Sequence, residues 1–214
     1  MAKQKLGIAM ITLNEEFHIP ATLAQFYSLN VLDDVVVVDG GSTDDTVSIC
    51  EKFGARVIHH PFENDFSAQK NRAISALETD WVYLHDPDER LEPTLLDIIP
   101  MLINVPEGQQ SLMYAGVLPG KDSFFDCFGI ARRNFIDGVQ TEVYPDYQYR
   151  LFRNYCRYKN PVHEEIINFE DRTEVDCSRD SLEKPSRFNI LHYKSSVRQK
   201  DQNALYAQIE KENS

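Results

Sequence analysis

The sequence predicts an α/β fold: a doubly wound, mostly parallel sheet in the first half of the chain, with an appended mixed sheet in the second half. Short apolar runs alternate with helix-periodic stretches as far as Leu84, and polar clusters follow several of these runs. The chain has 214 residues, of which 42% are hydrophobic, enough for a substantial core. We therefore expect a single domain over 1–214, made of a first half (1–105), a second half (106–194) and a C-terminal helix (195–214).

The first predicted elements form a strand, a helix and a second strand. Leu6–Leu13 is a short continuous apolar run, which is typical of a buried strand. Pro20 opens a stretch with helical spacing, and Val35–Val38 is the next strand. Ser42 or Thr43 is expected to cap the following helix. The remaining elements of this half are a helix that stops at Gly54, a strand at Arg56–His60, a helix at Phe66–Leu77 and a strand at Trp81–Leu84.

Polar side chains gather directly after three of these strands, at Asn14–Glu16, Asp39–Asp45 and His85–Arg90. In open parallel sheets, the ligand crevice lies beyond the carboxyl ends of the strands. We therefore expect these three clusters to converge on one crevice.

The second half is less regular. Pro93–Val105 has helical spacing, and a capping box at Ser196–Gln199 precedes a polar final helix, on which Leu205 and Ile209 suggest an oligomer contact. The predicted strands of the mixed sheet are Leu112–Leu118, Tyr147–Phe152 and Glu165–Phe169.

Charge and cysteine content exclude several classes of protein. There are 22 Lys and Arg against 34 Asp and Glu, a net charge of −12, which disfavours binding to nucleic acid or to anionic lipid. The cysteines form no C-x-x-C pair and are expected to be buried in a reducing compartment; they are Cys50, Cys127, Cys156 and Cys177. The apolar run near the N-terminus is too short for a signal peptide or a membrane span, so the expected location is the cytoplasm.

The sharpest local signal for chemistry is Asp86-Pro87-Asp88, which directly follows an apolar strand. Two neighbouring carboxylates repel each other unless a cation lies near them, and hard oxygen ligands suit Mg²⁺ or Mn²⁺ with substrate phosphates completing the shell. The alternative for an Asp-x-Asp sequence alone is a solvated acidic turn before the helix at Pro93.

Four motifs that occur in order favour the cation site over the acidic turn. They are T-L-N-E-E at 12–16, V-V-D-G-G-S-T-D-D-T at 37–46, A-Q-K-N at 68–71 and H-D-P-D-E at 85–89. Together they resemble the inverting family two glycosyltransferases, which have the GT-A fold. Asp146–Asn154, Pro161–Glu164 and Ile190–Tyr193 look like the acceptor-side motifs of the branch that includes lipopolysaccharide core glucosyltransferases. The chain departs from the family at Lys70, where Arg is more frequent, and at Gly40, which replaces an acidic residue.

This resemblance implies a metal-dependent hexosyltransferase that moves a sugar from a nucleoside diphosphate sugar, most often a UDP-sugar, to a hydroxyl group in glycan or lipopolysaccharide-type biosynthesis. It implies that 1–105 binds the donor and 106–194 the acceptor, a saccharide or lipid-linked glycan met at the inner face of the membrane. Thr12, Asn14 and Glu15 would line the nucleotide pocket. Asp39 would accept a hydrogen bond from the base of the nucleotide, and Lys70 would face that nucleotide base or the diphosphate.

The same resemblance assigns the cation site. Asp88 would bind Mn²⁺ or Mg²⁺ directly, Asp86 would approach the ribose or the metal, and His192 would be a further metal or phosphate ligand. The alternatives are ordinary strand packing for Thr12, a turn-forming side chain for Asp39, a solvated Lys70 and a satisfied interior histidine for His192.

Inversion needs a base for the attacking hydroxyl, and Glu164 is our candidate, with His163 orienting it or contacting a phosphate. Glu165 is the rival, because adjacent strand residues point to opposite faces; both could also be exposed strand charges. Glu89 is expected beside the site rather than as a ligand. For Arg150 and Arg153, which could contact an anionic acceptor or the diphosphate, an ordinary alternating strand is the better interpretation.

Two other functions stay open. One is a catalytically inactive partner subunit that binds a nucleotide sugar. The other is a phosphatase of the haloacid dehalogenase type, which would use Asp86 as the nucleophile but would require a hydroxyl residue where this chain has Arg90.

Overall fold

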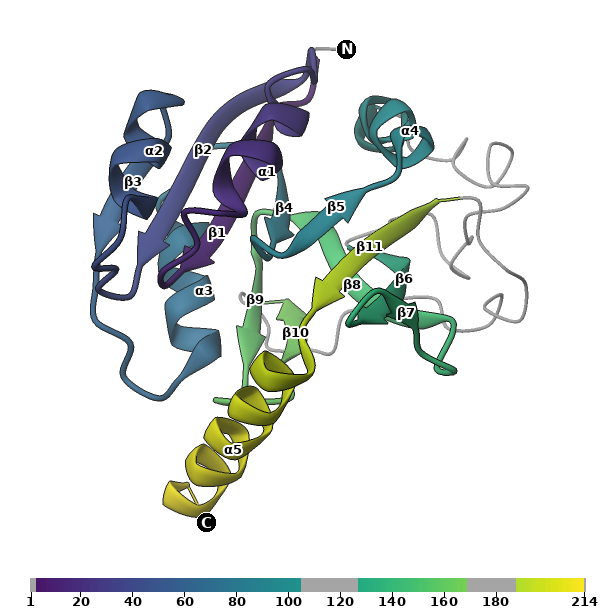
Figure 1. Cartoon of the computed structure of the whole chain (residues 1–214). Coiled ribbons are helices and arrows are strands. Elements are labelled where there is room, and N and C mark those ends of the chain that lie inside the picture. The colour runs from purple at the N-terminus through teal and green to yellow at the C-terminus, as the bar shows by residue number, and fades with distance from the viewer. Residues whose placement is uncertain (1–2, 105–126, 169–187, 214) are drawn as a thin grey trace.

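The computed structural model describes residues 3–104, 127–168 and 188–213, and its main feature is one curled, nine-stranded sheet (Figure 1). Four strands of the first half pair in parallel in the order β3 (Arg56–His59), β2 (Leu32–Asp39), β1 (Leu6–Thr12) and β4 (Trp81–His85). The predicted α/β class and the parallel sheet are confirmed.

The second half continues this sheet from β4. The strands follow in the order β8 (Asp146–Arg153), β6 (Cys127–Ile136), β11 (Asn189–Lys194) and β5 (Glu89–Leu91), with β7 (Val139–Gln140) paired to β6. β8 runs antiparallel to both β4 and β6, whereas β11 is parallel to β6. The mixed pairing was expected, but these strands extend the first sheet instead of forming a second one. The predicted strand at 112–118 lies outside the described residues, as does Cys177.

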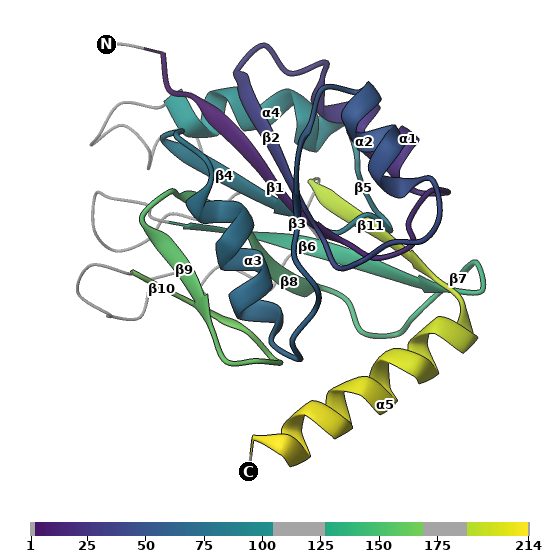
Figure 2. The same ribbon diagram turned by 90° about the vertical axis from the view of Figure 1, so that its left-hand side faces the viewer.

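Helices cover both faces of the parallel part. Apolar residues of α1 (Ile19–Phe26), α2 (Thr46–Lys52) and α4 (Pro93–Asn104) share one hydrophobic cluster with alternate residues of β1 and β4. On the other face, α3 (Phe66–Ser75) packs with the two-stranded sheet of β9 (Cys156–Lys159) and β10 (Glu165–Asn168) (Figure 2). This double coverage explains the continuous apolar runs of β1, β2 and β4.

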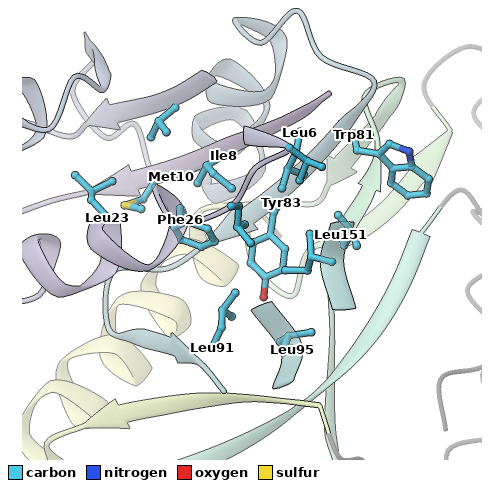
Figure 3. Packing of buried hydrophobic residues seen from close by; sticks show 14 of the residues in the cluster. Leu6, Ile8, Met10, Leu23, Phe26, Trp81, Tyr83, Leu91, Leu95 and Leu151 are labelled. Carbon is cyan, nitrogen blue, oxygen red and sulfur yellow. The ribbon is translucent and has the colours of Figure 1, made fainter. Parts of the chain in front are cut away.

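The larger cluster packs Tyr83 and Phe26 between β1, α1 and α4 (Figure 3). Leu6, Ile8 and Met10 point into it from β1 and are fully buried. Burial of a side chain of this size contributes roughly 1.5–3 kcal/mol, so this face anchors the strand ends that carry the polar clusters.

The predicted caps of two helices were wrong by a few residues. Asp45 precedes α2 without a side-chain cap, because Ser42 and Thr43 bond to the loop after β1 instead. For α5 (Ser196–Glu212), the cap is Ser195, whose hydroxyl accepts a hydrogen bond from Arg198 N.

Helix α5 leaves β11 and runs along the edge of the molecule, close to the β9–β10 hairpin (Figure 1). Its Tyr206 packs edge-on against Phe66 of α3, and Ile209 is fully buried. The expected exposure of Ile209 is therefore wrong, since this side chain is covered by its own chain, and the oligomer contact stays a prediction without support from it. None of the helices within 3–104, 127–168 and 188–213 is both long enough and apolar enough to span a bilayer.

Candidate active site

A cleft of about 2040 Å³ opens at the carboxyl ends of β1 and β4 and extends along β6, β8, β11 and α5. Its wall contains residues from each predicted polar cluster, including Asn14, Gly40 and Asp88. The expected convergence on one crevice is confirmed. The cleft also takes in side chains from 132–166 and 192–206, so both halves of the chain and α5 line it.

The loops after β1 and β2 are tied together by side-chain to backbone bonds. Asn14 has φ +53°, and its amide oxygen accepts a hydrogen bond from Thr43 N at 2.8 Å. Asn14 N donates to Ser42 Oγ at 2.8 Å, and Glu15 N donates to Thr46 Oγ1 at 2.7 Å. Asn tolerates this left-handed conformation better than most residues, so Asn14 shapes one end of the cleft.

Asp39 is held by its own turn. Its carboxylate accepts hydrogen bonds from Gly41 N and Ser42 N, both at 3.0 Å, and Thr12 Oγ1 lies 3.4 Å from its other oxygen. Asp39 and Thr12 are both buried. The structure therefore shows the turn-forming role that was one alternative for Asp39, and it places Thr12 beside that turn.

A largely buried ionic cluster forms part of the floor of the cleft. Arg150 Nη2 donates to Asp86 Oδ2 at 2.5 Å and to Glu89 Oε1 at 2.8 Å, and Arg132 reaches Glu89 at 3.2 Å. Burial alone would raise the pKa of Asp86, but Arg150 and Lys70 hold it well below its ordinary value. Asp86 is thus a charged residue oriented by Arg150. Arg150 lies in a strand, β8, as the favoured interpretation predicted, but its side chain is buried among carboxylates, which that interpretation did not include.

Asp88 and His192 face each other across the cleft wall. His192 Nε2 lies 3.4 Å from Asp88 Oδ2, and its Nδ1 lies 2.7 Å from Asn134 Oδ1. Because an amide oxygen accepts, Nδ1 donates there, and Nε2 points toward Asp88. Burial would raise the pKa of Asp88, but the hydrogen bond and charge of His192 lower it.

This pair fits a divalent cation. Metal-bound imidazoles donate their second ring N–H to an acceptor, as His192 does to Asn134, and Mg²⁺ or Mn²⁺ is held by one or two protein ligands plus phosphates. Within the described part of the chain, no cluster of three or more His, Cys, Asp or Glu side chains is arranged to hold a metal. Substrate oxygens and water would therefore have to complete the shell.

Glu15 is paired with a residue distant in the sequence. The guanidinium of Arg198, on α5, contacts its carboxylate, with one Nη1 to Oε2 distance of 3.2 Å, and lies 3.8 Å from Asp88 Oδ2. Burial raises the pKa of Glu15, and Arg198 partly opposes that effect. Arg198 thus links α5 to the loop after β1, next to the Asp88–His192 pair.

Glu164 and Glu165 both line the cleft, but they differ in burial and in ion-pair partner. Lys70 Nζ, on α3, donates to Glu164 Oε1 at 2.5 Å, and both side chains are largely buried. Glu165 pairs with Lys159 at 2.9 Å, and its side chain is 59% exposed. His163 does not contact Glu164; its ring is exposed, with Nε2 3.1 Å from Glu210 of α5.

Sequence reasoning missed two cations of this site, Arg132 and Arg198, and it named Arg150 without its buried carboxylate partners. Arg150 stands just before the apolar Leu151 and Phe152, and a charged residue there signals a buried ion pair. Arg198 carries no such signal, because its partner Glu15 is 183 positions away. Arg153 faces outward from the cleft, over the ring of Trp81 at 4.2 Å.

His85 gives the molecule a testable pH dependence. It is fully buried at the end of β4, with Nε2 3.1 Å from the Glu89 carbonyl oxygen, and burial lowers its pKa from 6.5 to about 4. Between these values the unfolded chain binds more protons, so this stabilisation is complete above about pH 6.5 and is lost as the pH falls toward 4. We expect roughly 2 kcal/mol of the free energy of unfolding to be lost from this source between pH 7 and pH 5.

Urea unfolding of the wild type and of His85→Gln at both pH values measures this term. The carboxylates of the chain titrate in both proteins. The difference between wild type and variant in how the free energy of unfolding changes with pH therefore isolates the contribution of His85. An equal change with pH in both proteins would contradict the expectation.

Comparison with known proteins finds a family whose sequence model resembles the first half of the chain. Residues 7–106 match the sequence model described as Glycosyl transferase family 2. An uncharacterized glycosyltransferase of Rickettsia conorii is 40% identical over 96 residues, 45% of this chain and 33% of that protein. The lipopolysaccharide core biosynthesis glycosyltransferase LpsC of Rhizobium meliloti is 29% identical over 106 residues, 47% of this chain and 38% of that protein. The matched region is therefore about a third of the length of these relatives.

Two solved structures are similar over more of the chain. Glucosyl-3-phosphoglycerate synthase from Mycobacterium tuberculosis, in complex with Mn²⁺, uridine diphosphate and glucosyl-3-phosphoglycerate, has a TM-score of 0.40 at 24% identity, over 63% of this chain and 45% of that chain. TarS of S. aureus has a TM-score of 0.49 at 16% identity, over 70% of this chain and 28% of that chain. The family resemblance drawn from the four motifs is confirmed by the sequence matches.

Proposed function

We propose, from the premise that residues 7–106 belong to glycosyl transferase family 2, that this protein transfers a sugar from a nucleoside diphosphate sugar to a hydroxyl acceptor, with inversion. The single observation that carries the proposal is the shared cleft. One cleft contains a pair suited to a divalent cation, Asp88 and His192, and a largely buried carboxylate, Glu164. These are the two parts that a direct displacement requires.

The donor end of the cleft lies at the loops after β1, β2 and β4. Asn14 and Glu15 line the cleft, and their loop is held in place by hydrogen bonds to 42–46. Asp88 and His192 would hold Mn²⁺ or Mg²⁺ against the diphosphate, and the cation would neutralise the charge that develops on the leaving group. A chain of net charge −12 needs such a cation to bind an anionic donor.

Glu164 is the proposed base. Its side chain comes from the start of β10 and is held at one oxygen by Lys70, which leaves the other oxygen to accept a proton from an attacking hydroxyl. Lys70 is thereby proposed to hold the general base, Glu164, rather than to contact the nucleotide. Asp39 and Thr12 shape the turn at the nucleotide end, and Asp86 orders the floor through Arg150.

The same geometry leaves the phosphatase alternative without support. In that reaction Asp86 would attack phosphorus, yet its carboxylate is paired with Arg150, and the residue two places after Asp88 is an arginine. We propose UDP as the nucleotide, on the resemblance stated above, and a glycan of the cell envelope as the acceptor.

Equilibrium titration of UDP, GDP and CDP, with and without Mn²⁺, tests the donor site. We expect Mn²⁺-dependent binding of UDP and weaker binding of the other two nucleotides. If none of the three binds under either condition, the proposed function fails.

A further inference from the structure

Lys194 is a cation in the cleft without an acidic partner among the described residues. It lies two residues after His192 on β11, so both side chains point to the same face of the strand, toward the cleft. Its ammonium contacts the amide oxygen of Gln202 on α5. Lys70, Arg132, Arg150 and Arg198, which also line the cleft, each pair with a carboxylate.

Residues of α5 that line the cleft show that Lys194 lies between the Asp88–His192 pair and Glu164. Arg198, Gln202 and Tyr206 follow one another at four-residue spacing and all line the cleft. Arg198 lies next to Asp88, whereas Tyr206 packs edge-on against His163, the neighbour of Glu164. Gln202 is about 6 Å along the helix from each of them. Lys194 therefore reaches the stretch of cleft between the cation pair and the proposed base.

The donors available there suit an anion. Lys194 has three N–H donors, and Gln202 uses one of them. Gln202 in turn donates to the Tyr206 hydroxyl at 3.0 Å, which fixes its amide oxygen toward Lys194. Lys194 forms no ion pair with a described residue, and only the carboxylates of Asp86 and Asp88, beyond ion-pair distance, favour its charged form, so its ammonium can donate to an anionic group of a ligand.

We propose that Lys194, supported by Gln202 and adjacent to Arg198, forms a subsite that binds a phosphate group of a substrate. The inference rests on the proposed function in taking the anion to be part of a substrate. Two substrates can supply it: the diphosphate of the donor, or a phosphate carried by the acceptor.

Isothermal titration of Lys194→Met tests the subsite. Lys200→Met is the matched control, because Lys200 is an exposed lysine near the start of α5, six residues after Lys194. UDP and uridine are titrated with Mn²⁺, and inorganic phosphate is titrated into protein saturated with UDP. Loss of a charge-assisted hydrogen bond is expected to weaken binding roughly 10- to 100-fold.

The two sources give different results. If the donor diphosphate occupies the subsite, Lys194→Met weakens UDP binding and leaves uridine unchanged. If an acceptor phosphate does, UDP binding is unchanged, whereas inorganic phosphate binds the UDP-saturated wild type and binds the variant more weakly. Lys200→Met behaves as the wild type in both cases.

Equal binding of UDP and of inorganic phosphate to wild type, Lys194→Met and Lys200→Met would overturn the subsite and leave the proposed function standing. If the wild type binds no nucleotide, the proposed function fails, and inorganic phosphate alone then decides on Lys194. Lys194→Gln, which keeps a polar side chain, replaces the Met variant if thermal unfolding shows that variant to be misfolded.

Discussion

Replacing Asp88 by Asn is expected to weaken Mn²⁺-dependent binding of UDP roughly 100-fold or more and to leave whatever binding occurs without the metal. Asp88 is the carboxylate proposed to hold the cation, and His192 alone supplies too few ligands for Mn²⁺. The amide of Asn has nearly the shape of the carboxylate, so the loop before β5 should keep its conformation. Isothermal titration of UDP with and without Mn²⁺ measures the effect.

Asp97→Asn is the matched control, because Asp97 is exposed on α4 and does not line the cleft. It should bind UDP as the wild type does. Undiminished Mn²⁺-dependent UDP binding in Asp88→Asn would remove Asp88 from the cation site.

The second large effect is expected for Glu164→Gln. An amide cannot accept the proton of the attacking hydroxyl, so kcat should fall roughly 10²- to 10⁴-fold while UDP binding stays unchanged. Release of UDP from UDP-glucose or UDP-N-acetylglucosamine, with water as the acceptor, gives a rate that does not require the natural acceptor to be known. Titration of UDP in parallel separates the chemical step from donor binding.

Glu165→Gln provides the control at the adjacent position. Glu165 also borders the cleft, but its side chain is 59% exposed and pairs with Lys159, and such exposed pairs contribute roughly 0–1 kcal/mol. Its rate should match the wild type. Equal loss in both variants, or loss only in Glu165→Gln, would contradict the assignment of the base to Glu164. Donor binding without measurable turnover in the wild type would instead favour the inactive partner subunit.

The elements of the first half were predictable because each is encoded locally. β1, β2 and β4 are continuous apolar runs, as strands covered by helices on both faces must be, and the polar residues after them mark the carboxyl ends. The motif at 85–89 likewise follows β4 directly, and Asp86 and Asp88 line the cleft as its position predicts. The helix caps were predicted less well. The Ser42 hydroxyl accepts a hydrogen bond from Asn14 N, and Thr43 N donates to the Asn14 side chain, so both residues bond to the loop after β1 instead of capping α2.

The second half was harder to predict because its strands are defined by their neighbours. β6 and β11 are parallel to each other and separated in the chain by β7, β8, β9 and β10, and no local periodicity encodes that order. The sequence suggested a second sheet, whereas the structure continues the first one, because β8 pairs with β4 on one side and β6 on the other.

By itself, the sequence determined the α/β class, the elements of the first half and the residues proposed to bind a cation or to accept a proton. Only the tertiary structure decided their partners: Lys70 with Glu164, Arg150 with Asp86, Arg198 with Glu15, and Lys194 with no carboxylate among the described residues. Apolar periodicity is a property of neighbouring residues and is visible in a short window. A charge in a cleft is controlled by whichever opposite charge the fold brings within a few ångströms, and that partner can come from anywhere in the chain.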